Sequence, residues 1–281
     1  MRRKIVPNGR PMVVTGTDLD PAYLFNCVKG INMKAYLLLA AAVAAIGQPT
    51  LAQTTSADAQ QTLAQASAVQ KYTFLLFYKT NNAATQAMLQ TLKRGLANRS
   101  NEATIAYVDA SNPGQQALVQ RYGVGRAPMP LTIAVAPNGA VTGLFAAKLS
   151  DQQIAGAFVT PTMAKCMKSM QQGRLVLVCV SGTAGATTPQ AVRDFQADPQ
   201  FANRTDVLSL QANDPAEAEF LGQLKIDGQA LHGTTTAFLA PPAVLVGKFG
   251  PAATKAEMAA ALHAAGKCCD DPNCKHGQGG R

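Results

Sequence analysis

The chain has 281 residues, of which 47% are hydrophobic and 15% are charged. A chain with this length and apolar content can bury a sizeable core, which excludes an intrinsically disordered protein and leaves room for one large domain or two small ones. The formal net charge is +9, but the basic residues are scattered, without a dense Lys/Arg cluster or interleaved aromatic residues, so we expect no nucleic-acid partner.

The segment from Met33 to Gln53 has the features of a secretory signal peptide. Lys34 precedes an apolar run of about a dozen residues, and a small-residue cleavage pattern ends at Ala52. The run is shorter than the roughly 20 residues that a membrane-spanning helix needs. We therefore predict a signal peptide over 33–52, cleavage after Ala52, and a periplasmic or extracellular protein with no membrane span in the mature chain. An uncleaved signal anchor is the alternative.

Residues 1–32 show no core-forming periodicity, and we interpret them as an unstructured, over-long start. From Lys71 onward, short apolar runs alternate with helical patterns. Strands are predicted at 72–78, 103–108, 131–135 and 140–145, and helices at 84–96, 114–122 and 151–158. Strands of this length alternating with helices indicate an α/β unit. Pro137-Asn138-Gly139 supplies the turn chemistry of a hairpin between the last two strands.

The same order of elements returns after Thr160, which indicates an internal repeat. Residues 111–124 match 213–226 at a shift of 102, and residues 134–137 match 238–241 at a shift of 104. In the second copy, a strand is predicted at 175–180 and helices at 163–170 and 256–265. Two domains are therefore expected, at 53–160 and 161–266, followed by a Cys-rich disordered tail at 267–281.

The first copy resembles the thioredoxin family over nearly its whole length. In that family, a central strand leads to a Cys-x-x-Cys pair at a helix start, and a cis-proline precedes the hairpin. Here the strand ending at Tyr78 places Asn82 and Thr85 at the cysteine positions, and Met129-Pro130 at the cis-proline. The resemblance implies two tandem thioredoxin-like domains, each an α/β fold with a central mixed sheet flanked by helices, and a cis bond before Pro130.

In the second copy, the resemblance places Thr183 and Ala186 at the cysteine positions and Thr234 at the cis-proline position. Neither copy has the thiols that disulfide exchange requires, namely a nucleophilic thiolate and a resolving thiol. Leu76 also occupies the place of the family's buried acidic residue. We therefore expect a protein that is not an enzyme and needs no cofactor.

Asn82 and Thr85 are interpreted as helix-start residues, whose side-chain oxygens accept backbone N–H bonds. The alternative is that they line a ligand groove together with Met129 and Pro130, because family members without the cysteines often resemble peptide-binding modules. We expect Asp109 to cap the end of its strand.

Two of the cysteines that follow the predicted signal peptide are expected in the core. Cys179 lies within an apolar strand, and Cys166 lies on a helix with methionines at helical spacing. The tail concentrates three more, Cys268, Cys269 and Cys274, together with His276. These four side chains could hold zinc or copper(I). Alternatively, the Asp-Pro-Asn turn could bring Cys274 back to one of the other two in a disulfide.

The resemblance favours an exported, non-catalytic binding or assembly module for peptides or other exported proteins. The alternative is a thiol–disulfide or metal-binding protein that acts through its tail, with the two domains as a scaffold. A purely structural envelope protein is a third interpretation.

Overall fold

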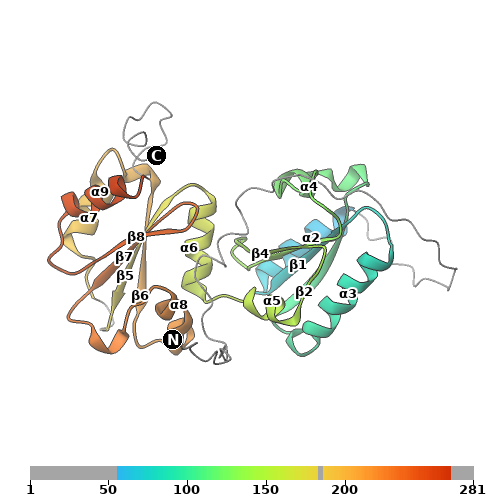
Figure 1. The fold of residues 1–281 in the computed structure, drawn as a ribbon, viewed down its shortest axis with the longest axis horizontal. Helices are drawn as coiled ribbons and strands as arrows, with labels where there is room; N and C mark the ends of the chain where they lie inside the picture. Colours follow the sequence, from blue (N-terminus) through green and yellow to red (C-terminus); the bar gives the residue numbers. More distant parts are fainter. Residues whose placement is uncertain (1–55, 183–185, 267–281) are drawn as a thin grey trace, which may run out of the picture.

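The computed structural model describes residues 56–182 and 186–266, and it contains two α/β domains that follow one another along the chain (Figure 1). The segments predicted as an over-long start, a signal peptide and a Cys-rich tail lie outside the described residues. Within the described ranges, none of the helices combines the length and apolar character that a membrane span requires.

Each domain has a four-stranded sheet with helices on both faces. The first domain contains α2 (Ser56–Ala68), β1 (Tyr72–Tyr78), α3 (Ala83–Gly95), β2 (Ala103–Asp109), α4 (Gln116–Arg121), β3 (Leu131–Val135), β4 (Val141–Ala146) and α5 (Asp151–Gly156). The second contains α6 (Pro161–Gln171), β5 (Leu175–Ser181), α7 (Gln190–Ala197), β6 (Thr205–Gln211), α8 (Ala218–Gln223), β7 (Thr235–Ala240), β8 (Val244–Phe249) and α9 (Lys255–Ala264). Short 3₁₀ turns, Pro113–Gln115 and Pro215–Glu217, lead into α4 and α8.

The elements predicted from the sequence all appear, with ends that differ by at most two residues. Helix α2 was not predicted. Its sequence is SADAQQTLAQASA, in which most apolar residues are alanines. The two faces of the helix therefore differ little in hydrophobicity. It is held by packing instead, because Ala59 and Ala66 are buried.

The two sheets share one topology. Their strand orders are β2-β1-β3-β4 and β6-β5-β7-β8. In each sheet the first pair is parallel and the other two pairs are antiparallel. Even the register shift recurs, after Ala134 in the first sheet and after Phe238 in the second. The structure therefore confirms the predicted tandem repeat and its mixed sheets.

Alternation along the central strand divides the first core into two layers. Phe74 and Leu76 face the layer that contains α3 and α5. Leu75 and Phe77 face the layer that contains α2 and α4. Strand β5 divides the second core in the same way. Leu175 and every second residue after it face α7 and α9. Val176 and every second residue after it face α6 and α8.

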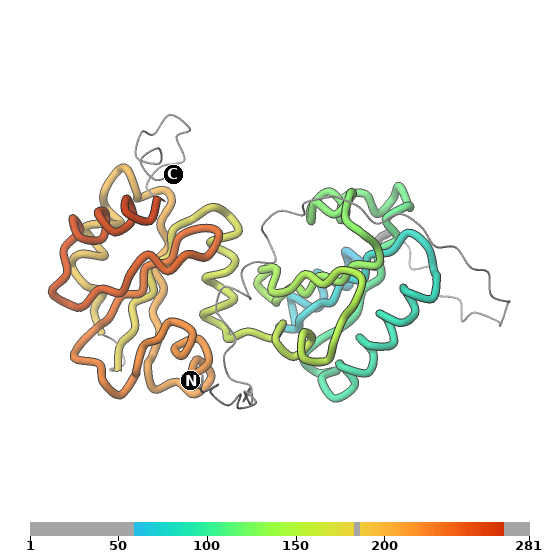
Figure 2. Tube along the Cα trace, in the orientation of Figure 1, coloured from blue at the N-terminus to red at the C-terminus, as the bar shows by residue number. Residues whose placement is uncertain are grey.

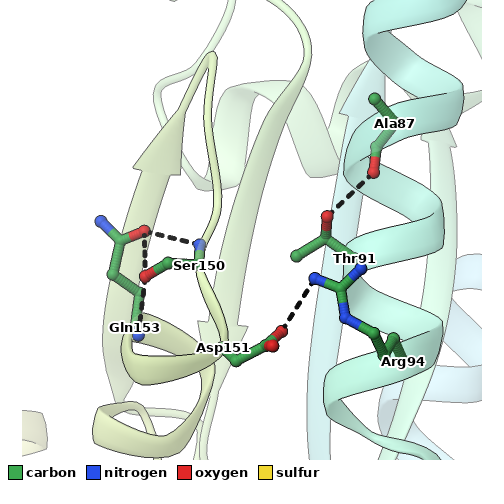
Figure 3. Close-up of polar contacts among 6 residues, drawn as sticks. All are labelled: Ala87, Thr91, Arg94, Ser150, Asp151 and Gln153. Atoms are coloured by element: carbon green, nitrogen blue, oxygen red, sulfur yellow. Dashed lines mark hydrogen bonds and ion pairs between the residues drawn. The ribbon is translucent and has the colours of Figure 1, made fainter.

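Helix α5 begins with a capping box (Figure 3). Ser150 accepts a hydrogen bond from the backbone of Gln153, and the Gln153 side chain accepts one from the backbone of Ser150 in return. Asp151 in the first turn pairs with Arg94 of α3 at 3.2 Å. The same box recurs at α9 with Thr254 and Glu257, which marks equivalent helix starts in the two copies.

Helix α6 belongs to the second domain but also contacts the first, and Figure 2 shows its yellow-green coil on the side of the second domain that faces the first. Lys168 donates a hydrogen bond to the carbonyl oxygen of Gly139 at 3.3 Å. Gln171 donates to the carbonyl oxygen of Val141 and accepts from its N–H, at 2.7 and 3.0 Å. Since Ala136 and Ala140 share the hydrophobic cluster of α6, the hairpin of the first domain docks on this helix.

Candidate functional site

The candidate peptide site of the first domain consists of Asn82, Thr85, Met129 and Pro130. Asn82 is the N-cap of α3, and its Oδ1 accepts a hydrogen bond from the backbone N–H of Thr85 at 3.0 Å. Thr85 is buried, and its hydroxyl donates to the carbonyl oxygen of Thr80 at 2.8 Å. The helix-start role predicted for Asn82 is thus confirmed. The acceptor role predicted for the Thr85 hydroxyl is wrong, because this hydroxyl donates to a carbonyl oxygen before the helix and closes the same turn.

The Met129–Pro130 bond is cis, as predicted. Pro130 is buried and Met129 is half-buried. Leu131, the next residue, pairs with Phe77 near the end of β1. Because α3 begins a few residues after β1 ends, this pairing brings the proline loop and the start of α3 to the same end of the sheet.

Polar groups that the sequence analysis did not assign to the site also lie at this end. Tyr78 is the last residue of β1 and pairs in register with Asp109. The pKa of the Tyr78 hydroxyl is raised, mainly by burial and further by Asp109 and Tyr107, so it is a hydrogen-bond donor at neutral pH. Asp109 accepts hydrogen bonds from the N–H and hydroxyl of Ser111, at 2.9 and 2.6 Å, which confirms its strand-end cap.

The start of α3 carries Asn82 and Thr85 at the two places that the thioredoxin resemblance assigns to cysteines. Leu76, which the resemblance places where the family has a buried acidic residue, is fully buried. Met129, which is half-buried, and Asn82, which is exposed, both lie at this end of the sheet.

The corresponding end of the second domain has a small pocket of about 90 Å³. Its walls are rich in hydroxyl groups and include Cys179, Ser181, Thr188 and Thr234. Thr234 immediately precedes β7, as predicted for the residue at the cis-proline position, whereas the cis bond of this domain lies at Pro241–Pro242. Ala186 also lines the pocket, and Thr183 lies outside the described residues.

Neither described cysteine is suited to act as a nucleophile. Burial raises the pKa of the Cys179 thiol, although a contact with the Thr236 hydroxyl opposes the effect. Burial raises the pKa of Cys166 to about 12, with a further contribution from the carboxylate of Glu217. Cys166 packs with Met163, Met167 and Met170 in the hydrophobic core. The core position predicted for Cys166 on its methionine-bearing helix is thus confirmed.

Within residues 56–182 and 186–266, no three His, Cys, Asp or Glu side chains come together as metal ligands would. The predicted tail site lies outside the described residues. Metal ligation or a disulfide by Cys268, Cys269, Cys274 and His276 therefore stays a prediction.

No protein-family model and no curated protein matches this chain. Three similar solved structures are the germline-specific thioredoxin Deadhead of Drosophila melanogaster, the first two thioredoxin domains of Naumovozyma dairenensis Eps1p, and human ERp44. Deadhead is 24% identical, with 40% of this chain and 93% of that chain covered and a TM-score of 0.30. Eps1p is 9% identical, with 75% of this chain and 96% of that chain covered and a TM-score of 0.28. ERp44 is 12% identical, with 81% of this chain and 61% of that chain covered and a TM-score of 0.35.

The classification of the fold follows from the strands themselves. Each domain has a central strand with one parallel and one antiparallel neighbour, and a closing antiparallel hairpin. In the first domain a cis-proline stands directly before β3. The chain therefore has two domains in tandem, each with a thioredoxin-like fold.

Proposed function

We propose that this protein is an exported, non-catalytic module that binds peptides or unfolded segments of other exported proteins at the site of Asn82, Thr85, Met129 and Pro130. The observation that supports the proposal most is the start of α3, where Asn82 Oδ1 accepts from the N–H of Thr85 and the Thr85 hydroxyl donates to the carbonyl oxygen of Thr80. The thioredoxin resemblance assigns these two residues to the redox positions. The four residues of the proposed site include no thiol.

The physical basis is a surface of mixed character at the end of a sheet. Met129 supplies a flexible apolar side chain, which adapts to varied partners. Exposed Asn82 and half-buried Tyr78 supply polar groups beside it. A partner held in this way is bound by contacts and released unchanged.

Two exposed alanines allow a direct test. Ala84 lies in the first turn of α3, beside the site, and Ala97 lies just beyond the other end of this helix. A photo-crosslinking residue at Ala84 should capture a reduced, carboxymethylated polypeptide, and the same residue at Ala97 should not. Equal capture at both positions would contradict binding at this site.

The non-catalytic part of the proposal has its own test. The purified protein should neither reduce insulin nor oxidise a reduced peptide above the uncatalysed rate. Robust turnover in either assay would overturn it. Export predicts a new N-terminus at Gln53 in protein recovered from outside the cytoplasm, and retention of Met33 would contradict the cleavage site.

The alternative is a thiol–disulfide or metal function of the tail, supported by three cysteines and a histidine between residues 268 and 276. Deletion of 267–281 separates the two proposals. If the tail acts, bound zinc or copper, or thiol chemistry, disappears with the deletion. If the domain site acts, crosslinking at Ala84 is unchanged.

A further inference from the structure

A second pocket, of about 340 Å³, lies on the first domain between helix α2 and the hairpin that joins β3 to β4. Helix α2 contributes Leu63 and Ala64, and the hairpin side contributes Val135 and Pro137. The volume falls within the range of about 300–1,000 Å³ that is usual for small-molecule sites.

This pocket is separate from the candidate peptide site. Strand β3 begins beside Pro130 at one end of the sheet and ends at Val135, which lines the pocket. At a rise of roughly 3.3 Å per residue, the strand holds the two places about 15 Å apart. Binding at one place can therefore be tested without altering the other.

Polar contacts from both domains hold the pocket walls in place. Ser67 donates a hydrogen bond from its hydroxyl to the carbonyl oxygen of Pro137 at 2.5 Å, which joins α2 to the hairpin. Lys168 of the second domain holds the hairpin at Gly139, whose φ of +80° suits glycine. The cavity is thus formed before any ligand arrives.

The charge around the pocket is positive. Arg121 lines it, is exposed, and has its guanidinium over the ring of Tyr122, 5.4 Å from the centroid. Among the described residues, no carboxylate lines the pocket and no ion pair engages Arg121. The ammonium group of Lys168 beside Gly139 adds a second positive charge near the wall.

We propose that this pocket binds a small carboxylate with an apolar tail. The carboxylate lies against the guanidinium of Arg121, because a guanidinium presents two parallel N–H donors to a carboxylate. The apolar tail lies against Leu63, Ala64 and Val135. There it is removed from contact with water, which favours binding. The exposed amide of Gln60, which also lines the pocket, is a further donor to the carboxylate.

Octanoate is a suitable probe, with octanol and octylammonium as controls that share the tail and change the head group. Titration of the full chain with octanoate, followed by amide NMR, should shift the signals of α2 and of the hairpin at Gly139. Octanol and octylammonium should bind at least about tenfold more weakly, the factor expected for losing one charge-assisted contact.

Two matched pairs of variants test the assigned residues. Arg121→Gln should weaken octanoate binding about tenfold, whereas Arg126→Gln, at another exposed arginine of the same domain, should leave it unchanged. Ala64→Phe should fill the pocket and abolish binding, whereas Ala68→Phe, exposed at the end of the same helix, should not. All four changes are at exposed positions, so the fold should be retained, which a thermal melt verifies.

Three results would overturn the proposal. One is no saturable octanoate binding. Another is equal affinity for octanoate and octanol, because the head group would then have no role. The third is binding that survives both Arg121→Gln and Ala64→Phe, because the ligand would then lie elsewhere on the chain.

Discussion

The hydroxyl of Tyr72 engages both backbone polar groups of Val159. It donates a hydrogen bond to the carbonyl oxygen at 3.0 Å and accepts one from the N–H at 3.1 Å. Tyr72 begins β1, whereas Val159 lies in the segment that leads from the first domain into α6. One phenol therefore joins the central sheet of the first domain to the connection between the two domains.

Tyr72→Phe should lower the free energy of unfolding by about 1–3 kcal/mol, because two partly buried backbone groups lose their partner while the ring remains. Urea unfolding measures the change. Tyr107→Phe is the matched control, because Tyr107 is also half-buried. In the part of the chain that the structure describes, both hydrogen bonds to Val159 come from the hydroxyl of Tyr72. Equal losses in the two variants would contradict the role assigned to the Tyr72 hydroxyl.

Glu217 stabilises the start of the interdomain helix. Its side chain is buried, and Oε1 accepts a hydrogen bond from the N–H of Thr162 in the first turn of α6 at 2.7 Å. Glu217→Ala should cost about 1–3 kcal/mol of unfolding free energy, because the N–H loses its acceptor. Glu217→Gln keeps the acceptor and should cost clearly less.

The first domain supports the choice of glutamine, since Gln115 is buried at the equivalent position and accepts a hydrogen bond from the backbone of Asp109. Denaturation of the two Glu217 variants side by side measures the difference. If the glutamine variant were as unstable as the alanine variant, the hydrogen bond that residue 217 accepts from the Thr162 N–H would not explain the loss of stability.

The ion pair of Arg174 and Asp206 should make stability depend on pH. Arg174 donates to both carboxylate oxygens, at 2.8 and 2.6 Å. These hydrogen bonds are the main reason that the pKa of Asp206 lies below its ordinary value. A lowered folded-state pKa stabilises the fold above the unfolded value of about 4, and this contribution is lost as the pH falls through the folded-state pKa.

Asp206→Asn should therefore cost stability near pH 7, and the cost should disappear toward pH 2–3. Because both side chains are about a third exposed, we expect a loss on the order of 1 kcal/mol. Urea unfolding at pH 7 and at pH 3 measures it. Asp151→Asn, in an exposed pair with Arg94, controls for the removed charge, and a cost of Asp206→Asn that is the same at both pH values would contradict the mechanism.

The described cysteines should resist alkylation in the folded protein. Because burial raises the pKa of Cys166 to about 12, the thiolate fraction at pH 8 is on the order of 10⁻⁴, and the thiol is also inaccessible. Peptide mapping after iodoacetamide treatment should find Cys166 and Cys179 unmodified in native protein and modified in guanidinium chloride. Fast native labelling of Cys166 would contradict its buried position.

Much of the secondary structure follows from local sequence. The strand ending at Tyr78 is a mostly apolar run, and in the structure it begins and ends at the residues that the pattern predicts. The starts of α5 and α9 are encoded by Ser150 and Thr254, each followed three residues later by a partner for a capping box. These features depend on neighbours a few positions apart, so the sequence alone is enough to locate them.

The amino-acid sequence by itself determined the repeat and the order of the strands along the chain. Only the tertiary structure decided the presence of α2, whose alanine-rich sequence forms a defined face when it packs on the sheet. It also decided the docking of α6 and the pocket beside Arg121. Their contacts join residues far apart in the chain, such as Tyr72 and Val159, which are 87 positions apart, and local periodicity carries no information about pairs at that separation.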